Sequence, residues 1–195
     1  KAARALELSF PEFMGRIDLF VHGTTIGTNT MLEGSGARVG LLTTEGFRDS
    51  LAIRRGKREY FWDFRKPYPP PIVPRYLRLG VRERIDKNGK VLTPLSREMV
   101  EEALSHFREE KVEAIAVCFL NSYLNPVHEE EAESAARKAF PAAFITSSAK
   151  LIPVMGEYER TSTAVIDAYV GPKTSRYLLL FAERLKEQGL SAPLY

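Results

Sequence analysis

The chain has 195 residues, enough to bury one sizeable α/β core, and its net charge of +3 is too mild to indicate a nucleic-acid partner. Its single cysteine, Cys118, excludes an internal disulfide. No apolar run approaches the ~20 residues that cross a bilayer, and no signal peptide is apparent, so we expect a cytoplasmic protein. The start without Met and the strand-like end lead us to expect a fragment of a longer polypeptide.

The most informative stretch runs over residues 20–32, with the sequence Phe-Val-His-Gly-Thr-Thr-Ile-Gly-Thr-Asn-Thr-Met-Leu. The apolar residues around 17–21 predict a buried strand, and Met31 and Leu32 before the glycines at 34 and 36 predict a short helix with a clear end. Ligands of open α/β sheets bind at the carboxyl ends of the strands, where the chain passes from a strand into a helix. The polar side chains at this junction are His22, Thr24, Thr25, Thr28 and Asn29.

These side chains have a chemical and a structural interpretation. Hydroxyls and an amide can hold a polar ligand, and His22 can transfer a proton near neutral pH. Alternatively, Thr24 or Thr25 caps the helix and the histidine packs as a structural residue.

Residues 38–43 predict a second buried strand, followed by a short helical turn over 47–53. Basic residues then alternate with aromatic ones between 54 and 64, a pattern that can bind single-stranded nucleic acid. Because the run is short and broken by Gly56, a loop whose aromatic side chains pack on the core is preferred. A third interpretation is that Arg55 or Arg58 holds a carboxylate or phosphate of a substrate.

Residues 54–95 are interpreted as a loop plus β-hairpin insertion. Prolines make residues 67–74 an extended spacer, and alternation over 76–85 predicts a half-exposed antiparallel strand. The Asn88-Gly89 turn predicts the hairpin.

The second half alternates helices and strands. A helix is expected from Ser96, a buried strand over 112–120 that packs Cys118 in the core, and another strand over 144–147. Polar residues 121–125 follow the first of these strands as a second wall of the same crevice. The helix that starts at Pro126 is expected to expose His128 and the glutamates at 129–131.

A further helix begins near Glu157, where Glu157 and Arg160 are spaced to pair on one face. It is expected to end at Gly171-Pro172, and a last amphipathic helix over 173–188 to stop at Gly189. Together these elements predict one α/β lobe over residues 1–195, with a mixed sheet, flanking helices and the inserted hairpin.

Several runs resemble the N-terminal half of the hydantoinase A/oxoprolinase family. They are residues 21–30, residues 36–49, residues 116–126 and the Glu-Tyr-Glu-Arg-Thr-Ser-Thr run at 157–163. The resemblance implies one lobe of the ribonuclease H-like fold shared by actin, heat-shock chaperones and sugar kinases. It also implies an ATP-dependent hydrolase that opens hydantoin, 5-oxoproline or lactam rings by phosphorylating the amide oxygen. The alternatives are a subunit of an acetone- or acetophenone-type carboxylase and a non-catalytic assembly lobe.

The same resemblance suggests roles for individual residues. The catalytic candidates are His22, Thr24 and Thr25; the substrate-binding candidates are Thr28, Asn29, Arg55, Glu159 and Arg160. It implies ATP and Mg²⁺ in the full-length protein, and a hydantoinase B-type subunit and a second copy of the chain as partners. The family's Asp-Gly-Gly-Thr phosphate loop is missing from these 195 residues, so we expect this chain alone to hold neither cofactor nor metal and to be inactive.

Overall fold

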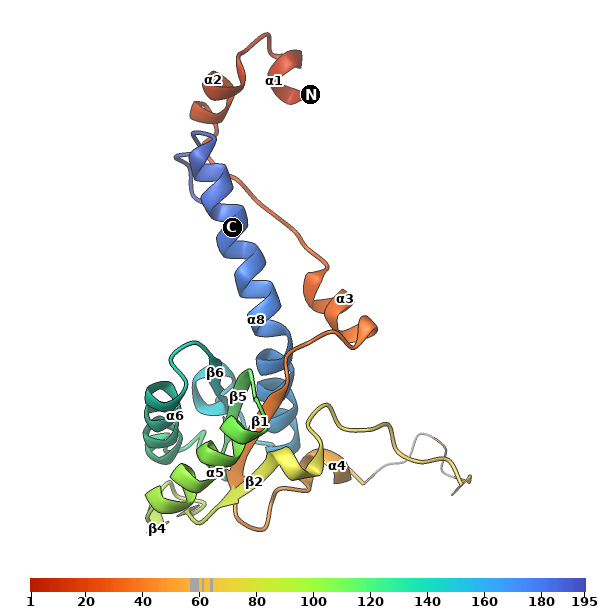
Figure 1. Ribbon diagram of the computed structural model, residues 1–195, viewed down its shortest axis with the longest axis vertical. Coiled ribbons are helices and arrows are strands. Elements are labelled where there is room, and N and C mark those ends of the chain that lie inside the picture. The colour runs from red at the N-terminus through yellow and green to blue at the C-terminus, as the bar shows by residue number, and fades with distance from the viewer. Residues whose placement is uncertain (57–59, 61, 64) are drawn as a thin grey trace. The chain divides into compact units, whose positions relative to one another are not determined.

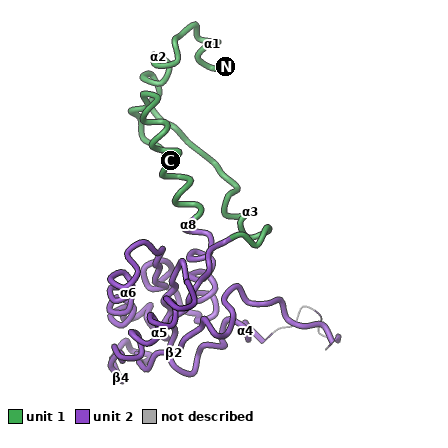
Figure 2. Tube along the Cα trace, viewed as in Figure 1, with its two compact units in different colours: residues 1–35, 173–195 green, residues 36–172 purple. Residues whose placement is uncertain are grey.

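A computed structural model describes residues 1–56, 60, 62–63 and 65–195. The chain divides into two compact units (Figure 2). Unit 1 comprises residues 1–35 and 173–195, and unit 2 comprises residues 36–172.

A four-stranded parallel sheet forms the centre of unit 2, in the order β2-β1-β5-β6 (Figure 1). Leu42 lies opposite both Leu79 and Val117 in the register. Strands β1 and β5 are buried along their whole length, because both faces of a parallel sheet are covered. The strands are β1 (Val39–Thr44), β2 (Arg78–Val81), β5 (Ala114–Cys118) and β6 (Phe144–Ser147).

Helices cover both faces of this sheet. Helices α5 (Arg97–Glu109) and α6 (Val127–Ala139) pack on one face, where the Phe107 ring lies so close to Gly40 that a Cβ there would be 2.8 Å from it. The first half of α8 (Glu157–Glu187) packs on the other face, where Thr161 lies 3.2 Å from the Cys118 sulfur. The core of unit 2 therefore has two layers of side chains, one on each side of the sheet.

The expected mixed sheet is wrong in one respect: the main sheet is entirely parallel. The segment predicted as one antiparallel strand over 76–85 instead contains a 3₁₀ turn, η1 (Arg75–Leu77), then β2, then β3 (Arg84–Ile85). Only β3 pairs antiparallel, with β4 (Val91–Thr93). Alternating side chains report which face a residue occupies but not the direction of the neighbouring strand, so the pattern fitted both arrangements.

The predicted hairpin turn is confirmed. The amide of Asp86 donates to the Lys90 carbonyl at 2.9 Å, and Gly89 has a φ of +80°, which a residue with a side chain rarely adopts. The described part of unit 2 also contains the short helices α4 (Ser50–Ile53) after β1 and α7 (Ser148–Leu151) after β6.

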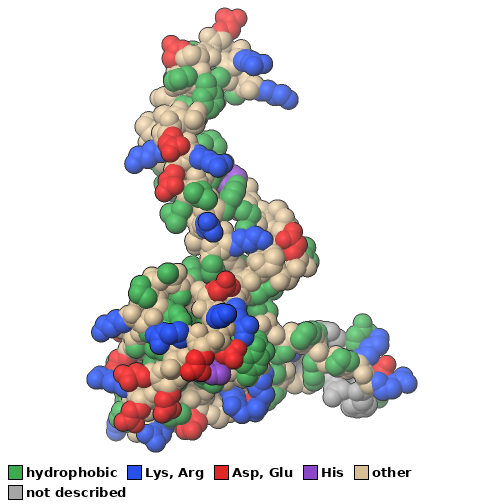
Figure 3. Space-filling model, in the orientation of Figure 1, with side chains coloured by type: hydrophobic (Ala, Val, Ile, Leu, Met, Phe, Trp, Pro, Cys, Tyr) green, Lys and Arg blue, Asp and Glu red, His purple; other side chains and the backbone are tan. Residues whose placement is uncertain are grey.

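Unit 1 contains α1 (Ala2–Ala5), α2 (Phe10–Gly15), α3 (Ile26–Glu33) and the second half of α8. Among its described residues only Met14 and Leu190 are buried hydrophobic side chains, while many others are exposed (Figure 3). Exposed examples are Leu19, Val21, Leu32 and Leu179.

The buried strand predicted around 17–21 is wrong. Val21 is 71% exposed, and the segment forms only an isolated parallel bridge between Phe20 and Leu194. An apolar run becomes a buried strand only where a sheet and a covering layer exist, and within the described part of unit 1 residues 193–195 are the only segment that bridges to it.

The predicted break at Gly171-Pro172 is also wrong, because α8 continues through Pro172. Packing offsets the ~3 kcal/mol that a proline costs inside a helix. Ala164, Val165 and Ala168 are fully buried, and the Phe144 ring lies against Gly171 where a Cβ would be 2.5 Å away. The described part of the chain contains no helix long and apolar enough to span a membrane.

Candidate functional site

The predicted site residues fall in both units. His22, Thr24, Thr25, Thr28 and Asn29 belong to unit 1, whereas Arg55, Glu159 and Arg160 belong to unit 2. Arg58 lies outside the described residues, as do the aromatic positions 61 and 64.

His22 lies in an aromatic cluster of unit 1. Its Nε2 is 2.9 Å from the Tyr177 hydroxyl, and its ring centroid is 4.3 Å from that of Phe181 on the same helix. Phe20 completes the cluster through an edge contact with Phe181. The His22 amide donates to the Tyr195 carbonyl at 2.7 Å, so both its backbone and its ring are held.

The hydroxyls that follow His22 lie around the start of α3. Thr24 Oγ1 accepts from the Ile26 amide at 3.3 Å, and Thr25, the N-cap residue, accepts from the Asn29 side chain at 3.4 Å. Thr24, Thr25, Thr28 and Asn29 are all exposed. Thr24 and Asn29 thus make the local contacts expected of a helix start and remain open to solvent.

A buried ion pair in unit 2 joins the carboxyl end of β5 to two helices. Arg160 is 1% exposed, and its guanidinium lies 3.8 Å from the fully buried Glu129 carboxylate. Arg160 donates to the Phe119 carbonyl at 2.7 Å and to the Ser148 hydroxyl at 2.9 Å. Glu129 in turn accepts from the Phe119 amide at 2.8 Å and from the Ser122 hydroxyl at 2.6 Å.

The second buried cluster joins the ends of β1 and β5. Thr44 Oγ1 accepts from the Leu120 amide at 2.8 Å and donates to the Glu83 carboxylate. The other Glu83 oxygen lies 2.7 Å from His128 Nδ1. All three side chains of this cluster are nearly inaccessible.

The expectation that His128 and Glu129 are exposed is wrong. Helical spacing shows that consecutive glutamates point in different directions but does not show which one faces the sheet. Burial of Glu129 is stabilised because its carboxylate accepts the amide and hydroxyl donors left at the end of β5. The polar residues 121–125 are the sequence feature that could have indicated this burial, because backbone groups at the end of a buried strand need hydrogen-bond partners.

That run forms a turn instead of an open wall. Asn121 has a φ of +57°, and its side chain donates to the Ile85 carbonyl at 2.9 Å. Asn125 donates to the Gly89 carbonyl at 2.8 Å. Both amides therefore connect the end of β5 to the β-hairpin.

Arg55 and Glu159 meet at the surface of unit 2. Arg55 Nε donates to the Glu159 carboxylate at 2.6 Å. The pKa of this carboxyl lies below its usual value, mainly because of a hydrogen bond with the Glu159 backbone and secondly because of the Arg55 hydrogen bond. The neighbouring Tyr158 has a lowered pKa, mainly because of a hydrogen bond with Arg54. The two predicted binding residues Arg55 and Glu159 are thus brought together, while Arg160, one turn away from Glu157, points into the core.

Glu157 begins α8 and lies among groups from different elements. Burial raises its pKa, against the opposing effects of the Ser50 hydroxyl and of the charges of Arg160 and Arg84. Among the described residues its Oε1 is buried without a hydrogen-bond partner. The sequence pattern did not indicate this half-buried carboxyl, because the spacing of Glu157 and Arg160 suggested that the two side chains pair with each other.

Cys118 is fully enclosed, as predicted. Burial is the main reason that the pKa of its thiol is raised to about 11. A neutral, enclosed thiol packs as a small hydrophobic side chain and does not act as a nucleophile.

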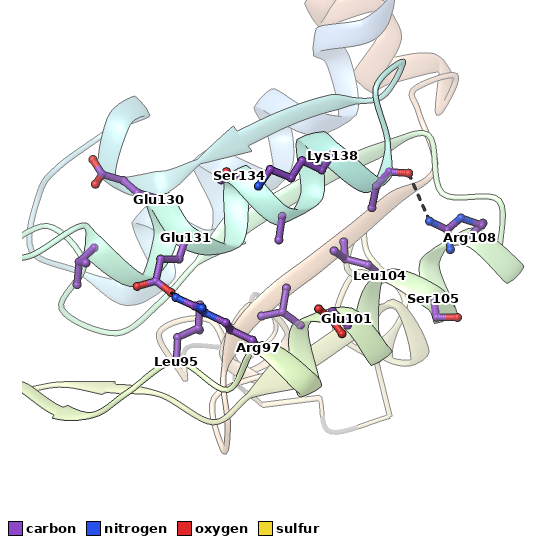
Figure 4. A pocket seen from close by; sticks show the side chains of 14 residues that line it. Leu95, Arg97, Glu101, Leu104, Ser105, Arg108, Glu130, Glu131, Ser134 and Lys138 are labelled. Carbon is purple, nitrogen blue, oxygen red and sulfur yellow. Dashed lines mark hydrogen bonds and ion pairs between the residues drawn. The ribbon is translucent and has the colours of Figure 1, made fainter.

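A surface groove of about 880 Å³ runs between α5 and α6 (Figure 4). Leu104 and Val100 contribute apolar surface, and the Arg97–Glu131 pair crosses it at 3.2 Å. None of the predicted site residues lines it. Its charged side chains are of both signs, namely Arg97, Arg108, Lys138, Glu101, Glu130 and Glu131.

Among the described residues there is no group of three or more His, Cys, Asp or Glu side chains that would hold a metal ion. Gly34, with a φ of +63°, ends α3 and does not open a helix onto a phosphate. The start of α3 offers the exposed Thr24 and Thr25 hydroxyls to a polar group.

Known proteins match nearly the whole chain. Caprolactamase subunit alpha of Pseudomonas jessenii is 38% identical over 98% of this chain, and acetophenone carboxylase gamma subunit of Aromatoleum aromaticum is 39% identical over 93% of it. This chain covers 28% and 27% of those proteins, respectively. It therefore spans less than a third of the relatives' length.

Two solved structures share the fold. The crystal structure of ATP-dependent caprolactamase from Pseudomonas jessenii matches with a TM-score of 0.90 at 37% identity, over 99% of this chain and 28% of that one. The nucleotide-free structure of acetone carboxylase matches with a TM-score of 0.86 at 25% identity, over 96% of this chain and 28% of that one. A family model described as the hydantoinase/oxoprolinase N-terminal region matches residues 3–140, and the chain belongs to this family.

Proposed function

We propose that the full-length protein containing this chain is an ATP-dependent enzyme that opens a cyclic amide. The observation that carries this proposal is the match over 99% of the chain to ATP-dependent caprolactamase, with a TM-score of 0.90. Residues 1–195 form part of one ribonuclease H-like lobe in this proposal, and ATP and Mg²⁺ bind in the full-length protein.

The residues of the chain divide into supporting and exposed groups. The Arg160–Glu129 and Thr44–Glu83–His128 clusters hold the ends of β1 and β5 in place without reaching solvent. In the proposal Arg160 positions this edge of the sheet, while Arg55 and Glu159 contact substrate.

Ring opening develops negative charge on the amide oxygen and needs a proton for the departing nitrogen. Exposed Thr24, Thr25, Thr28 and Asn29 offer donors for such charge, and His22 supplies a proton-transfer group.

A second candidate is a subunit of an ATP-dependent ketone carboxylase. The observation that favours it is the 39% identity to acetophenone carboxylase gamma subunit. The matched proteins carry the words subunit alpha and gamma subunit in their names. We therefore include a second, hydantoinase B-type subunit and a homo-oligomer in the proposal for both candidates.

The test is ATP hydrolysis by the full-length protein with its partner subunit, across 5-oxoproline, hydantoins, lactams, and ketones with bicarbonate. Stimulation by a cyclic amide is the expected result. Stimulation only by a ketone with bicarbonate would move the protein to the carboxylases. Stimulation by none of these compounds would favour a non-catalytic assembly role.

A further inference from the structure

Glu157 lies where elements that follow three neighbouring strands converge. Ser50 in α4 follows β1, and Arg84 in β3 follows β2. Both lie near enough to the Glu157 carboxyl to lower its pKa, Ser50 through its hydroxyl and Arg84 through its charge. Arg160, which also acts on it, donates to the Phe119 carbonyl at the end of β5. Ligands of open α/β sheets bind outside the carboxyl ends of their strands, so this position is suited to contact one.

The carboxylate has an acceptor that the described protein leaves unused. Its Oε1 is buried and has no hydrogen-bond partner among the described residues, whereas the Glu129 carboxylate nearby accepts several. An unpaired buried acceptor is unfavourable, so this oxygen calls for a partner from outside the described chain, such as a water molecule, an ion or a ligand.

Glu157 is only partly buried as a residue, although its Oε1 is enclosed. The last torsion of a glutamate is broad and roughly two-fold, so the carboxylate can reorient toward a ligand without a change of rotamer at its aliphatic torsions. The preceding Gly156 has a φ of +119°, and a Cβ at this position would lie 2.7 Å from the Glu159 carboxylate. Arg55, Tyr158 and Glu159 lie at the adjacent surface.

We propose that Glu157 accepts a hydrogen bond from the N–H group of a secondary cyclic amide and so selects lactam-type substrates over ketones. This inference rests on the proposed function. A lactam N–H supplies the donor that Oε1 lacks, whereas a ketone or an N-methylated lactam has no N–H and leaves the acceptor unpaired. Sites built to hydrogen-bond a substrate group reject analogues without it, because the site's own polar atom then stays unsatisfied.

Selectivity is measured as the ratio of kcat/KM for ε-caprolactam to that for N-methyl-caprolactam, with the full-length protein, its partner subunit and ATP. The wild-type ratio is expected to be about 10- to 100-fold. Glu157→Met, which removes the acceptor but keeps most of the volume, is expected to lower the ratio to within about 3-fold of unity. Glu157→Gln keeps a neutral acceptor and is expected to give an intermediate ratio. Glu98→Gln, in the exposed first turn of α5, is the matched control and keeps the wild-type ratio.

The outcomes separate the two proposals. Turnover of ε-caprolactam with a wild-type ratio near unity overturns the role of Glu157 alone, and this comparison needs no variant. A Glu157→Met protein, or if it does not fold a Glu157→Gln protein, that keeps the full wild-type ratio overturns it as well. Absence of ATP-dependent turnover of any cyclic amide by the wild type overturns the proposed function itself.

Discussion

The two units differ in how their polar residues are held. Unit 2 encloses a continuous apolar core, and its buried charges, such as Arg160 and Glu129, have several partners each. Unit 1 buries little apolar surface, and its polar side chains Thr24 to Asn29 remain exposed around α3. Hydrophobic burial is the main favourable term in folding, so unit 2 should account for most of the stability of the chain.

The difference also separates two kinds of candidate residue. In unit 2 the predicted substrate contact Arg160 is buried and held by several groups of the protein. In unit 1 His22 is held by Tyr177 and Tyr195, whereas Thr24 and Thr25 are exposed and can meet a ligand. A perturbation of unit 2 should therefore reduce global stability, and a perturbation of unit 1 should have local effects.

The largest effect is expected for Arg160→Met. Removing one partner leaves the Glu129 carboxylate buried and uncompensated, which should lower the free energy of unfolding by about 3 to 5 kcal/mol. Urea unfolding followed by circular dichroism measures it. Arg97→Met is the matched control, because Arg97 is exposed in its ion pair with Glu131 and its loss should be too small to resolve. Equal effects of the two variants would contradict the structural role of the buried pair.

Core truncation sharpens the same contrast. Leu42→Ala, at a fully buried position of β1, is expected to cost about 2 to 5 kcal/mol of unfolding free energy. Leu179→Ala, at a 65% exposed position of α8 in unit 1, should stay within about 0.5 kcal/mol. A comparable loss for Leu179→Ala in the same urea titration would show that unit 1 has a core of its own.

A smaller, local effect is expected for Tyr177→Phe. The variant removes the hydroxyl that meets His22 Nε2 but keeps the aromatic packing, so the loss should be about 0.5 to 1.5 kcal/mol, confined to unit 1. Hydrogen exchange of the His22 amide should become several-fold faster. The Leu42 amide in unit 2 serves as the internal control, and acceleration there would argue against a local effect.

The smallest effect is a pH dependence at Glu157. Burial raises the pKa of this carboxyl in the folded state, so the native protein binds the proton more tightly than the unfolded chain does. The stability gained from this protonation is lost as pH rises through the folded pKa. Glu157→Gln should therefore be more stable than wild type at pH 7, with the difference disappearing below about pH 4, where both states of the wild type are protonated. Urea titrations at both pH values measure it. A variant less stable than wild type at pH 7 would contradict the cause assigned to the shift.

Local patterns predicted most of unit 2 but not what its polar residues face. The strand around Leu42, the helix after Ser96 and the Asn88-Gly89 turn follow from side-chain periodicity and turn chemistry, and the structure contains all three. Burial of Glu129 and His128 depends on which helix face meets the sheet, and the continuation of α8 through Pro172 depends on packing against Phe144. Both are tertiary effects that no short sequence window contains.

The candidate site was predictable in part. The placement of Thr24 and Thr25 at the start of a helix came from the residue types alone, whereas the contact between His22 and Tyr177 joins residues 155 positions apart. Glu157 was assigned to a pair with Arg160 because the two are three residues apart. In the structure the guanidinium turns instead to Glu129 and the end of β5.

The most direct measurement of the proposed activity is product formation by the full-length protein with its partner subunit, ATP and ε-caprolactam. Cyclic-amide opening predicts that the ring-opened amino acid and ADP accumulate together in equal amounts. Absence of ring-opened product, with a labelled carboxylated product formed from a ketone and ¹³C-bicarbonate instead, would contradict it.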